Sequence, residues 1–228
     1  MRAPEQTFSY RYPHPAVTTD VVVFTIREQR LHLLLIQRAN PPYQGQWALP
    51  GGFLDIDEDI NACASRELAE ETGLTDLFLE QLYTFGSPNR DPRERVISIA
   101  YYALVPNDRI AEPVASSDAA AVAWFPFDEL PETAFDHAHI VAKAHERLVA
   151  KLDYSSIALQ FMPEQFTLGE LQAVYETLRG SELDKRNFRK HILSLDIIEE
   201  TGEQKRNGKH RPARAYRARR PKRVEIIK

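Results

Sequence analysis

"GGFLDIDEDINACASRELAEETGL", residues 51–74, places seven carboxylates within 24 residues and a single arginine, Arg66, among them. Like charges at this density repel one another, so the cluster lowers the stability of a fold unless something compensates for it. Two explanations fit the stretch. It is either a solvated acidic surface or a segment that holds a cation.

The second half of this stretch has the periodicity of a helix. Apolar Ile60, Ala64 and Leu68 recur at intervals of four residues, and Gly73 supplies a helix stop. We therefore expect a helix over residues 59–72. The chain's single cysteine, Cys63, belongs to the same apolar face and is expected in the core.

On such a helix Glu67, Glu70 and Glu71 share one face, because residues three and four positions apart are neighbours. Converging carboxylates favour a hard divalent cation, here Mg²⁺ or Mn²⁺. Gly51, in the glycine pair before the helix, adds a backbone carbonyl that can come close to the ion. The predicted metal ligands are Gly51, Glu67, Glu70 and Glu71.

The spacing as a whole resembles a Nudix box: Gly52, five residues, Glu58, seven residues, then "RELAEETGL" at residues 66–74. The resemblance implies an α/β fold, the Nudix α/β/α sandwich with a mixed sheet. It also implies hydrolysis of a nucleoside diphosphate linked to another moiety, with cations that lower the pKa of a bound water. Glu58 is placed to serve the helix N-terminus or to orient Arg66. The residues implied in catalysis are Glu58, Arg66, Glu67, Glu70 and Glu71.

A further acidic ligand or base comes from a later loop in Nudix proteins, and the best candidate for it here is Asp118 in "SSDAAAVAWF". Glu112 competes for this role, and a plain turn residue is the structural alternative for Asp118. Stacking on a base and charge pairing to phosphate require aromatic and arginine side chains. The candidates for substrate binding are Arg38, Trp47, Phe85, Arg93, Arg95 and His137. Some of these candidates have an alternative to ligand binding. Trp47 can instead belong to the core, and Arg93 and Arg95 can lie in a solvated loop. His137 can have a structural role at a helix start.

The flanking segments complete the expected sandwich. Apolar alternation and apolar runs predict strands over residues 16–26, 31–39, 47–49, 76–86, 95–105 and 120–127, and helical periodicity follows over residues 138–152. Two short amphipathic segments, residues 167–180 and 184–195, then precede a predicted β-hairpin over residues 196–218. Helix, turn, helix and hairpin in this order indicate a winged helix-turn-helix. We expect a Nudix domain over residues 1–152 and the winged domain over residues 153–228, joined by a linker at residues 153–165.

Charge separates the same two halves. Residues 161–228 carry 16 Lys and Arg against 10 Asp and Glu, whereas the preceding part carries 13 against 23. A basic helix beside a basic hairpin suits the phosphate backbone of double-stranded DNA, although a charge run is often only a solvated surface. The predicted DNA contacts are Lys185, Arg186, Arg189, Lys190, Lys205, Arg206, Lys209 and Arg211.

The segments "FTLGELQAVYETLRG", "LDKRNFRKHIL" and "TGEQKRNGKHRPARAYR" behind a Nudix domain resemble the Nudix-related transcriptional regulators of NAD metabolism. The resemblance implies a homodimeric repressor whose front domain senses ADP-ribose or a related nucleotide. An undamaged Nudix box implies that hydrolysis persists beside regulation. Two alternatives stay open: an ADP-ribose pyrophosphatase whose C-terminal domain serves dimerisation, and a sugar-responsive regulator of the same architecture.

The longest apolar runs are far shorter than the roughly 20 residues that span a bilayer. The first residues, "MRAPEQTFSYRYPHPA", lack the apolar core of a secretory signal. We expect a cytoplasmic protein with no membrane partner.

Overall fold

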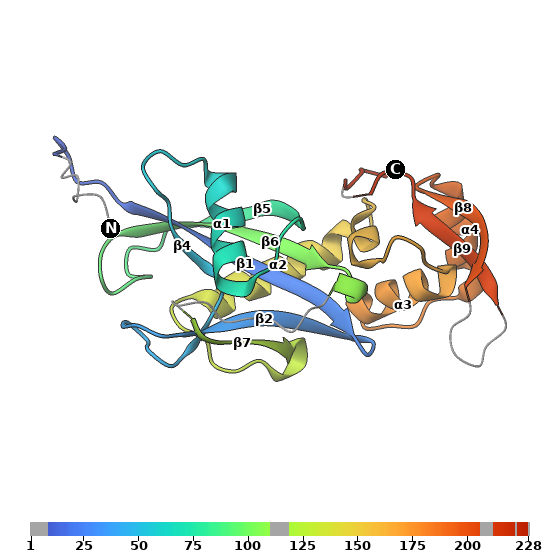
Figure 1. Ribbon diagram of the computed structural model, residues 1–228, viewed down its shortest axis with the longest axis horizontal. Helices are drawn as coiled ribbons and strands as arrows, with labels where there is room; N and C mark the ends of the chain where they lie inside the picture. Colours follow the sequence, from blue (N-terminus) through green and yellow to red (C-terminus); the bar gives the residue numbers. More distant parts are fainter. Residues whose placement is uncertain (1–8, 110–118, 206–211, 222, 228) are drawn as a thin grey trace.

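The computed structural model describes residues 9–109, 119–205, 212–221 and 223–227. The chain forms two lobes that follow one another in sequence, with the N-terminal lobe built on one large sheet (Figure 1). Within the described ranges, no helix is long and apolar enough to cross a membrane.

The N-terminal lobe is organised by a seven-stranded mixed sheet. Its central order is β3-β2-β1-β6-β5, with β4 paired to β1 and β7 paired to β2. The β1–β6 pair is parallel, and the other pairs are antiparallel. The strands are β1 (Ala16–Arg27), β2 (Arg30–Arg38), β3 (Trp47–Ala48), β4 (Gly51–Phe53), β5 (Phe78–Phe85), β6 (Val96–Val105) and β7 (Ala119–Pro126).

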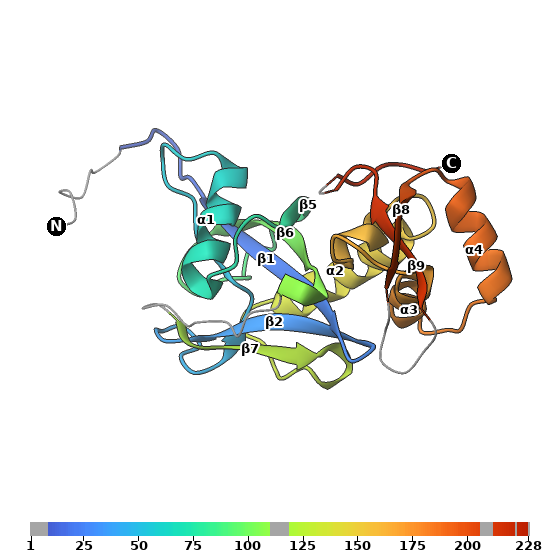
Figure 2. The same cartoon turned by 45° about the vertical axis from the view of Figure 1, so that its right-hand side comes forward.

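Helices cover both faces of this sheet, α1 (Ile60–Thr72) on one and α2 (His137–Lys151) on the other (Figures 1 and 2). Alternation along β1 shows the two layers. Val21 and Val23 pack with Leu68 of α1, whereas Val22 and Phe24 belong to the core that includes α2. The predicted α/β/α sandwich with a mixed sheet is confirmed. Two short 3₁₀ turns, η1 (Asn107–Arg109) and η2 (Phe127–Glu129), follow β6 and β7.

Helix α1 begins and ends as its sequence predicts. Asp59 is the N-cap, and its side chain accepts a hydrogen bond from the Asn61 amide. Gly73 ends the helix in the left-handed region, φ 73°, with its N–H on the Ala69 carbonyl. These two caps fix the length of the helix that carries the carboxylate cluster.

The C-terminal lobe contains α3 (Leu168–Arg179), α4 (Lys185–Ser194) and the antiparallel pair β8 (Ile198–Lys205) and β9 (Ala213–Ala218). A capping box between Thr167 and Glu170 starts α3, and the Asp184 side chain caps α4. This arrangement of two helices and a strand pair confirms the predicted winged helix.

The segment between the lobes differs from the expected linker. It contains a 3₁₀ helix, η3 (Ile157–Phe161), in which all five side chains are buried. The apolar side chains of η3 explain the difference, since Ile157, Ala158 and Phe161 join the core that runs from the sheet to α3 and α4. The two lobes therefore share one continuous hydrophobic cluster.

A polar contact also ties the lobes together. The Thr177 hydroxyl of α3, in the winged lobe, donates to the Gln29 carbonyl in the β1–β2 turn at 3.3 Å. A cavity of about 500 Å³ lies between the lobes and is lined by residues of both, among them Phe78, Arg109 and Arg217.

Candidate nucleotide site and DNA-binding surface

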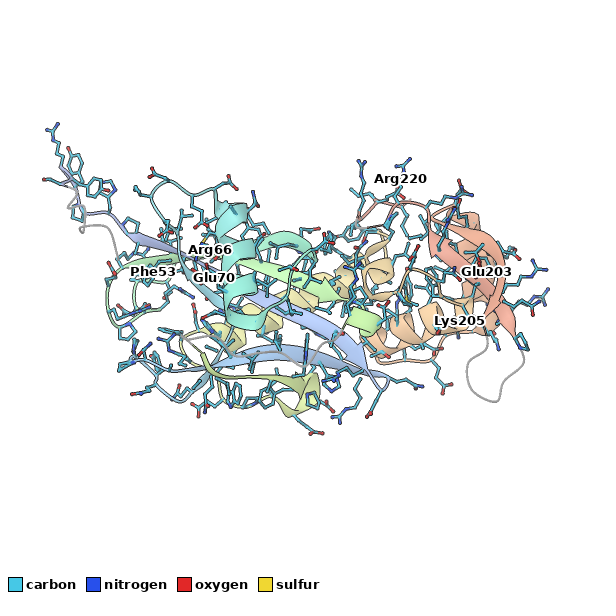
Figure 3. The ribbon with its side chains drawn as sticks, viewed as in Figure 1. Phe53, Arg66, Glu70, Glu203, Lys205 and Arg220 are labelled. Atoms are coloured by element: carbon cyan, nitrogen blue, oxygen red, sulfur yellow. The ribbon has the colours of Figure 1, made fainter. Side chains whose placement is uncertain are left out.

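Arg66 is the centre of the carboxylate cluster on α1 (Figure 3). Its guanidinium makes two hydrogen bonds of 2.8 Å to Glu58, one of 2.7 Å to Glu67 and one of 3.2 Å to Glu70. The hydrogen bonds to Glu58 are the main cause of the raised pKa of the Arg66 guanidinium, and the same contact lowers the pKa of Glu58. Glu58 was expected either to serve the helix N-terminus or to orient Arg66. Its two hydrogen bonds to the guanidinium show that it orients Arg66.

Glu67 is the most enclosed carboxylate that Arg66 contacts, with its side chain 13% exposed. Burial raises the pKa of Glu67, and the Arg66 charge opposes that shift. The carboxylate lies directly against Gly52, where an added Cβ would overlap it. The absence of a side chain at Gly52 therefore makes room for Glu67.

Glu71 is buried and reaches the opposite end of the glycine pair. Its Oε2 accepts a 2.8 Å hydrogen bond from the Gly51 amide. Gly51 in turn packs so tightly on β1 that a Cβ would overlap the Thr19 carbonyl. Gly51 thus lies beside the carboxylate cluster and contacts Glu71 through its N–H, while its role as a metal ligand through the carbonyl stays a prediction.

Three carboxylates on helix α1 have the chemistry that a hard divalent cation requires: Glu67, Glu70 and Glu71. In the part of the chain that the structure describes, no three His, Cys, Asp or Glu side chains stand together as a ready metal group. The geometry gives the reason, since Arg66 holds Glu67 and Glu70 while Gly51 holds Glu71. A cation would take the place of the Arg66 contacts to Glu67 and Glu70, and Glu70 is free to move because its side chain is 59% exposed.

A cleft of about 170 Å³ adjoins the glycine pair. Residues from β1, β2, β4, the loop after β5 and the start of α2 line it. The lining comprises Thr18, Asp20, Ile36, Arg38, Leu49, Gly51, Gly52, Phe53, Arg90, Asp91, Arg93, Phe135 and His137.

A buried ionic network forms the inner wall of this cleft. Arg90 makes a two-pronged contact to Asp136, at 2.6 and 3.0 Å, and reaches Asp20 at 3.3 Å. Asp20 also accepts a hydrogen bond from the Ser98 hydroxyl, and its Oδ1 lies 3.4 Å from His137 Nε2. The charges on Arg90 are satisfied within the protein, which makes this network a fixed support for the cleft.

His137 connects that network to the strand before the glycines. Its Nδ1 accepts a 2.9 Å hydrogen bond from the Leu49 amide, so the neutral ring carries its proton on Nε2, toward Asp20. Burial lowers the pKa of His137. His137 therefore lines the cleft and has the structural role that was its alternative, while its contact with a ligand stays a prediction.

Arg38 and Arg93 lie over aromatic rings at the cleft. The Arg38 guanidinium is 4.9 Å from the Phe135 ring centre, and Arg93 is 5.1 Å from Phe53 and 5.8 Å from Phe135. Arg93 also makes two hydrogen bonds to Asp91, of 2.7 and 3.0 Å. The structure thus brings two of the predicted ligand-binding arginines together.

Three other predicted ligand residues lie outside the cleft lining. Trp47 packs edge-on against Phe125, with 4.7 Å between ring centres, and Phe85 is buried in the main core. Arg95 donates to the Ser87 carbonyl at 3.0 Å in the loop after β5. Trp47 and Phe85 do not line the cleft because their rings pack against the apolar core. Asp118 and Glu112 fall outside the described residues.

Several cleft residues carry no sequence signal strong enough to select them in advance. Asp20 is a charged residue beside the apolar run of β1, and this position was the one sequence signal that could have marked it as a cleft residue. Arg90, Asp91 and Phe135 lie in irregular segments, and folding is what brings Arg90 and Phe135 to the same cleft.

Helix α4 presents the predicted basic surface. Phe188 and Ile192 are buried against the core, and the opposite side carries exposed cations. The exposed cations are Lys185, Arg186, Arg189 and Lys190. Within the described ranges, none of these four side chains forms an ion pair with an acid.

The strand pair differs from α4 in this respect. Arg214 pairs with Glu200 at 3.0 Å, and Arg217 pairs with Glu199 at 2.6 Å. Lys205 of β8, labelled in Figure 3, is a predicted DNA contact. It forms an ion pair with Glu170 of α3 at 3.0 Å and so braces the strand pair against the helix. Three other predicted contacts, Arg206, Lys209 and Arg211, lie outside the described residues.

Comparisons with known proteins agree with this two-part organisation. Residues 15–144 match the NUDIX domain family, whose hydrolases in general use divalent metal ions. Residues 158–218 match the NrtR DNA-binding winged helix domain.

Individual relatives match over most of the chain. A protein of Acinetobacter baylyi named "ADPR responsive transcriptional repressor NtrR" is 38% identical over 210 residues, which are 90% of this chain and 83% of the relative. An ADP-ribose pyrophosphatase of Methanocaldococcus jannaschii is 39% identical over 130 residues, or 57% of this chain and 73% of the relative. The solved structure of Shewanella oneidensis NrtR complexed with a 27mer DNA matches with a TM-score of 0.80 at 36% identity, covering 89% of this chain and 93% of that one. The chain belongs to the Nudix family, in the group that joins a Nudix domain to an NrtR-type DNA-binding winged helix.

Proposed function

We propose that this protein is a DNA-binding transcriptional regulator controlled by ADP-ribose or a related nucleoside diphosphate. The observation that carries the proposal is the exposed α4 surface, whose four cations have no acidic partner in the described part of the chain. Cations without protein partners on a recognition helix are suited to the phosphates of duplex DNA. The likeness to a DNA-bound NrtR structure supports the same role.

The cleft in the Nudix domain is the proposed sensor. Arg38 and Arg93 supply positive charge, and Phe53 and Phe135 supply aromatic faces. Together these groups suit a ligand that combines a diphosphate with a base or sugar. The name of the Acinetobacter baylyi relative supports ADP-ribose as that ligand. We further propose Mg²⁺ or Mn²⁺ as the cation, held by Glu67, Glu70, Glu71 and the backbone of Gly51.

The proposal is tested by fluorescence anisotropy with duplex DNA from the gene's own promoter region. We expect binding at low salt, and a change in affinity when ADP-ribose is added with Ca²⁺ to limit its hydrolysis. A DNA of scrambled sequence measures the non-specific contribution. Failure to retain the promoter duplex at low salt would refute the regulatory role.

A second function, hydrolysis of ADP-ribose to AMP and ribose 5-phosphate, is favoured by the complete set of acidic residues on α1. Their cation would neutralise the diphosphate and activate a water. E70Q and E71Q keep the side-chain volume and remove a charge, so each should abolish turnover while the fold survives. In E71Q the amide oxygen can still accept the Gly51 hydrogen bond. Wild-type turnover no faster than buffer with Mg²⁺ or Mn²⁺ would exclude this activity.

We also propose that the regulator acts as a homodimer, because two recognition helices on a two-fold axis read two half-sites of an operator. A protein that meets chromosomal DNA and a metabolic nucleotide would work in the cytoplasm. Sedimentation of the free protein and of its DNA complex gives the number of chains in each.

A further inference from the structure

Thr18 has a buried hydroxyl without a partner. In the described part of the chain, three buried side-chain polar atoms lack a hydrogen bond: Thr18 Oγ1, Thr133 Oγ1 and Trp124 Nε1. Of these three side chains, Thr18 is the one that lines the cleft. Thr18 is 8% exposed. A buried hydroxyl left unpaired lowers the stability of a fold, so such a group calls for an explanation.

The alternation of β1 shows which way Thr18 faces. Thr19 faces α1, where its Oγ1 lies 3.3 Å from Cys63 Sγ. Asp20 faces the other side of the sheet and meets Arg90 and Ser98 at the cleft wall. Thr18 is two residues from Asp20, so the period of two in a strand places both on the cleft side.

The environment of Arg38 is a second, independent observation that points to an anionic ligand. Its hydrogen bonds go to backbone carbonyls, that of Pro42 at 2.7 Å and that of Asn40 at 3.4 Å. Among the residues that the structure describes, no carboxylate forms a salt bridge with it. Burial and then the nearby Arg93 charge lower the pKa of Arg38, although the Glu71, Asp91 and Asp20 carboxylates partly oppose that shift. An anion in the cleft would relieve this repulsion.

We propose that the Thr18 hydroxyl donates a hydrogen bond to an anionic oxygen of the ligand's diphosphate, next to the Arg38 guanidinium. The hydroxyl supplies the donor that this cleft otherwise leaves unused, and Arg38 supplies the charge. Thr18 is then a ligand-binding residue rather than a packing residue of β1. The inference rests on the proposed function, because it takes the ligand to be a nucleoside diphosphate.

The test compares T18V with T133V and T18S. Valine copies the shape of threonine without the hydroxyl, and Thr133 provides a matched control because its Oγ1 is also unpaired and its side chain is not part of the cleft lining. Calorimetric titration with ADP-ribose in Ca²⁺ measures affinity, and thermal unfolding without ligand measures stability.

We expect T18V to weaken ADP-ribose binding by about 10- to 100-fold, the range for a lost hydrogen bond to a charged group. T18S should bind within about threefold of the wild type, and T133V should bind as the wild type does. Without ligand, T18V should melt at the wild-type temperature or above, since it removes an unsatisfied hydroxyl.

Contrary results separate the inference from the proposed function. A wild-type protein that binds no ADP-ribose would overturn both. Wild-type binding that T18V leaves unchanged would overturn the inference alone. A T18V protein that unfolds or melts well below T133V would also overturn it, because the hydroxyl would then have a partner inside the folded protein.

Discussion

Two neighbouring glycines are required for different physical reasons. A side chain at Gly51 would overlap a backbone oxygen, the Thr19 carbonyl, which a β-strand holds in place. A side chain at Gly52 would overlap the Glu67 carboxylate, which is the far end of a flexible side chain. The first position therefore protects the fold, and the second protects the geometry of the carboxylate cluster on α1.

Alanine at each glycine should separate these two roles. G51A should lower the free energy of unfolding by about 2 kcal/mol or more, because β1 and β4 must move apart. G52A should change that free energy by less than about 1 kcal/mol and weaken Mn²⁺ binding by about tenfold or more, because Glu67 is displaced. Denaturant unfolding and Mn²⁺ titration by electron paramagnetic resonance measure the two effects. Equal behaviour of the two variants would contradict this account.

His137 should make stability depend on pH. Its pKa is lowered in the folded protein, so the unfolded state binds the proton more readily. The contribution of the neutral ring is then fully present above the unfolded pKa of about 6.5 and declines as the pH falls below it, by up to about 1.4 kcal/mol per pH unit.

The variant H137N tests that dependence, because the asparagine oxygen can replace Nδ1 as acceptor for the Leu49 amide. Its free energy of unfolding should fall less steeply between pH 6.5 and 5 than that of the wild type. H191N, which removes an exposed histidine from α4, should follow the wild-type curve. Parallel curves for H137N and wild type would show that protonation of His137 does not limit stability.

At the scale of elements, regular periodicity is what made prediction possible. The first hairpin, α1 and the two helices of the winged domain are each close to their expected bounds. The predicted linker fails because its apolar residues are too few to show a period, although they fill the core between the lobes. Likewise, the sequence could indicate Arg38 and Arg93, yet the pairing of Arg90 with Asp136 joins segments 46 residues apart and depends on the folded sheet.

Helix α4 should provide most of the salt dependence of DNA binding. R189A removes an exposed cation with no acidic partner in the described residues, so the slope of log affinity against log salt should fall by about 0.9. R214A makes the same change of charge on β9, where the arginine already pairs with Glu200, and should alter the slope less. Anisotropy titrations at several salt concentrations give both slopes. A larger effect for R214A would assign the main phosphate contacts to the strand pair.

In the whole molecule, the two lobes are placed to influence each other. A continuous hydrophobic cluster runs from the sheet through η3 to α3 and α4. The contact of Thr177 with Gln29 links α3 to the turn between two strands that also reach the cleft beside the glycine pair. The cavity of about 500 Å³ between the lobes leaves space for a small change in their packing. Such a joint can transmit a ligand effect if it has two arrangements with different affinities.

Reciprocity is the strictest test of that coupling. If ADP-ribose changes the affinity for operator DNA by some factor, operator DNA must change the affinity for ADP-ribose by the same factor, typically about 5- to 150-fold, or 1–3 kcal/mol. Both titrations should use Ca²⁺ or the E70Q variant, so that the ligand is not consumed. T177A, which removes the contact to Gln29, should reduce both factors equally if this contact belongs to the coupling path.

Two factors that differ beyond error would mean that the titrations follow different species, such as monomer and dimer. Two factors of one, in a protein that binds both partners, would mean that the Nudix cleft does not control the winged helix and that the carboxylates of α1 serve hydrolysis alone.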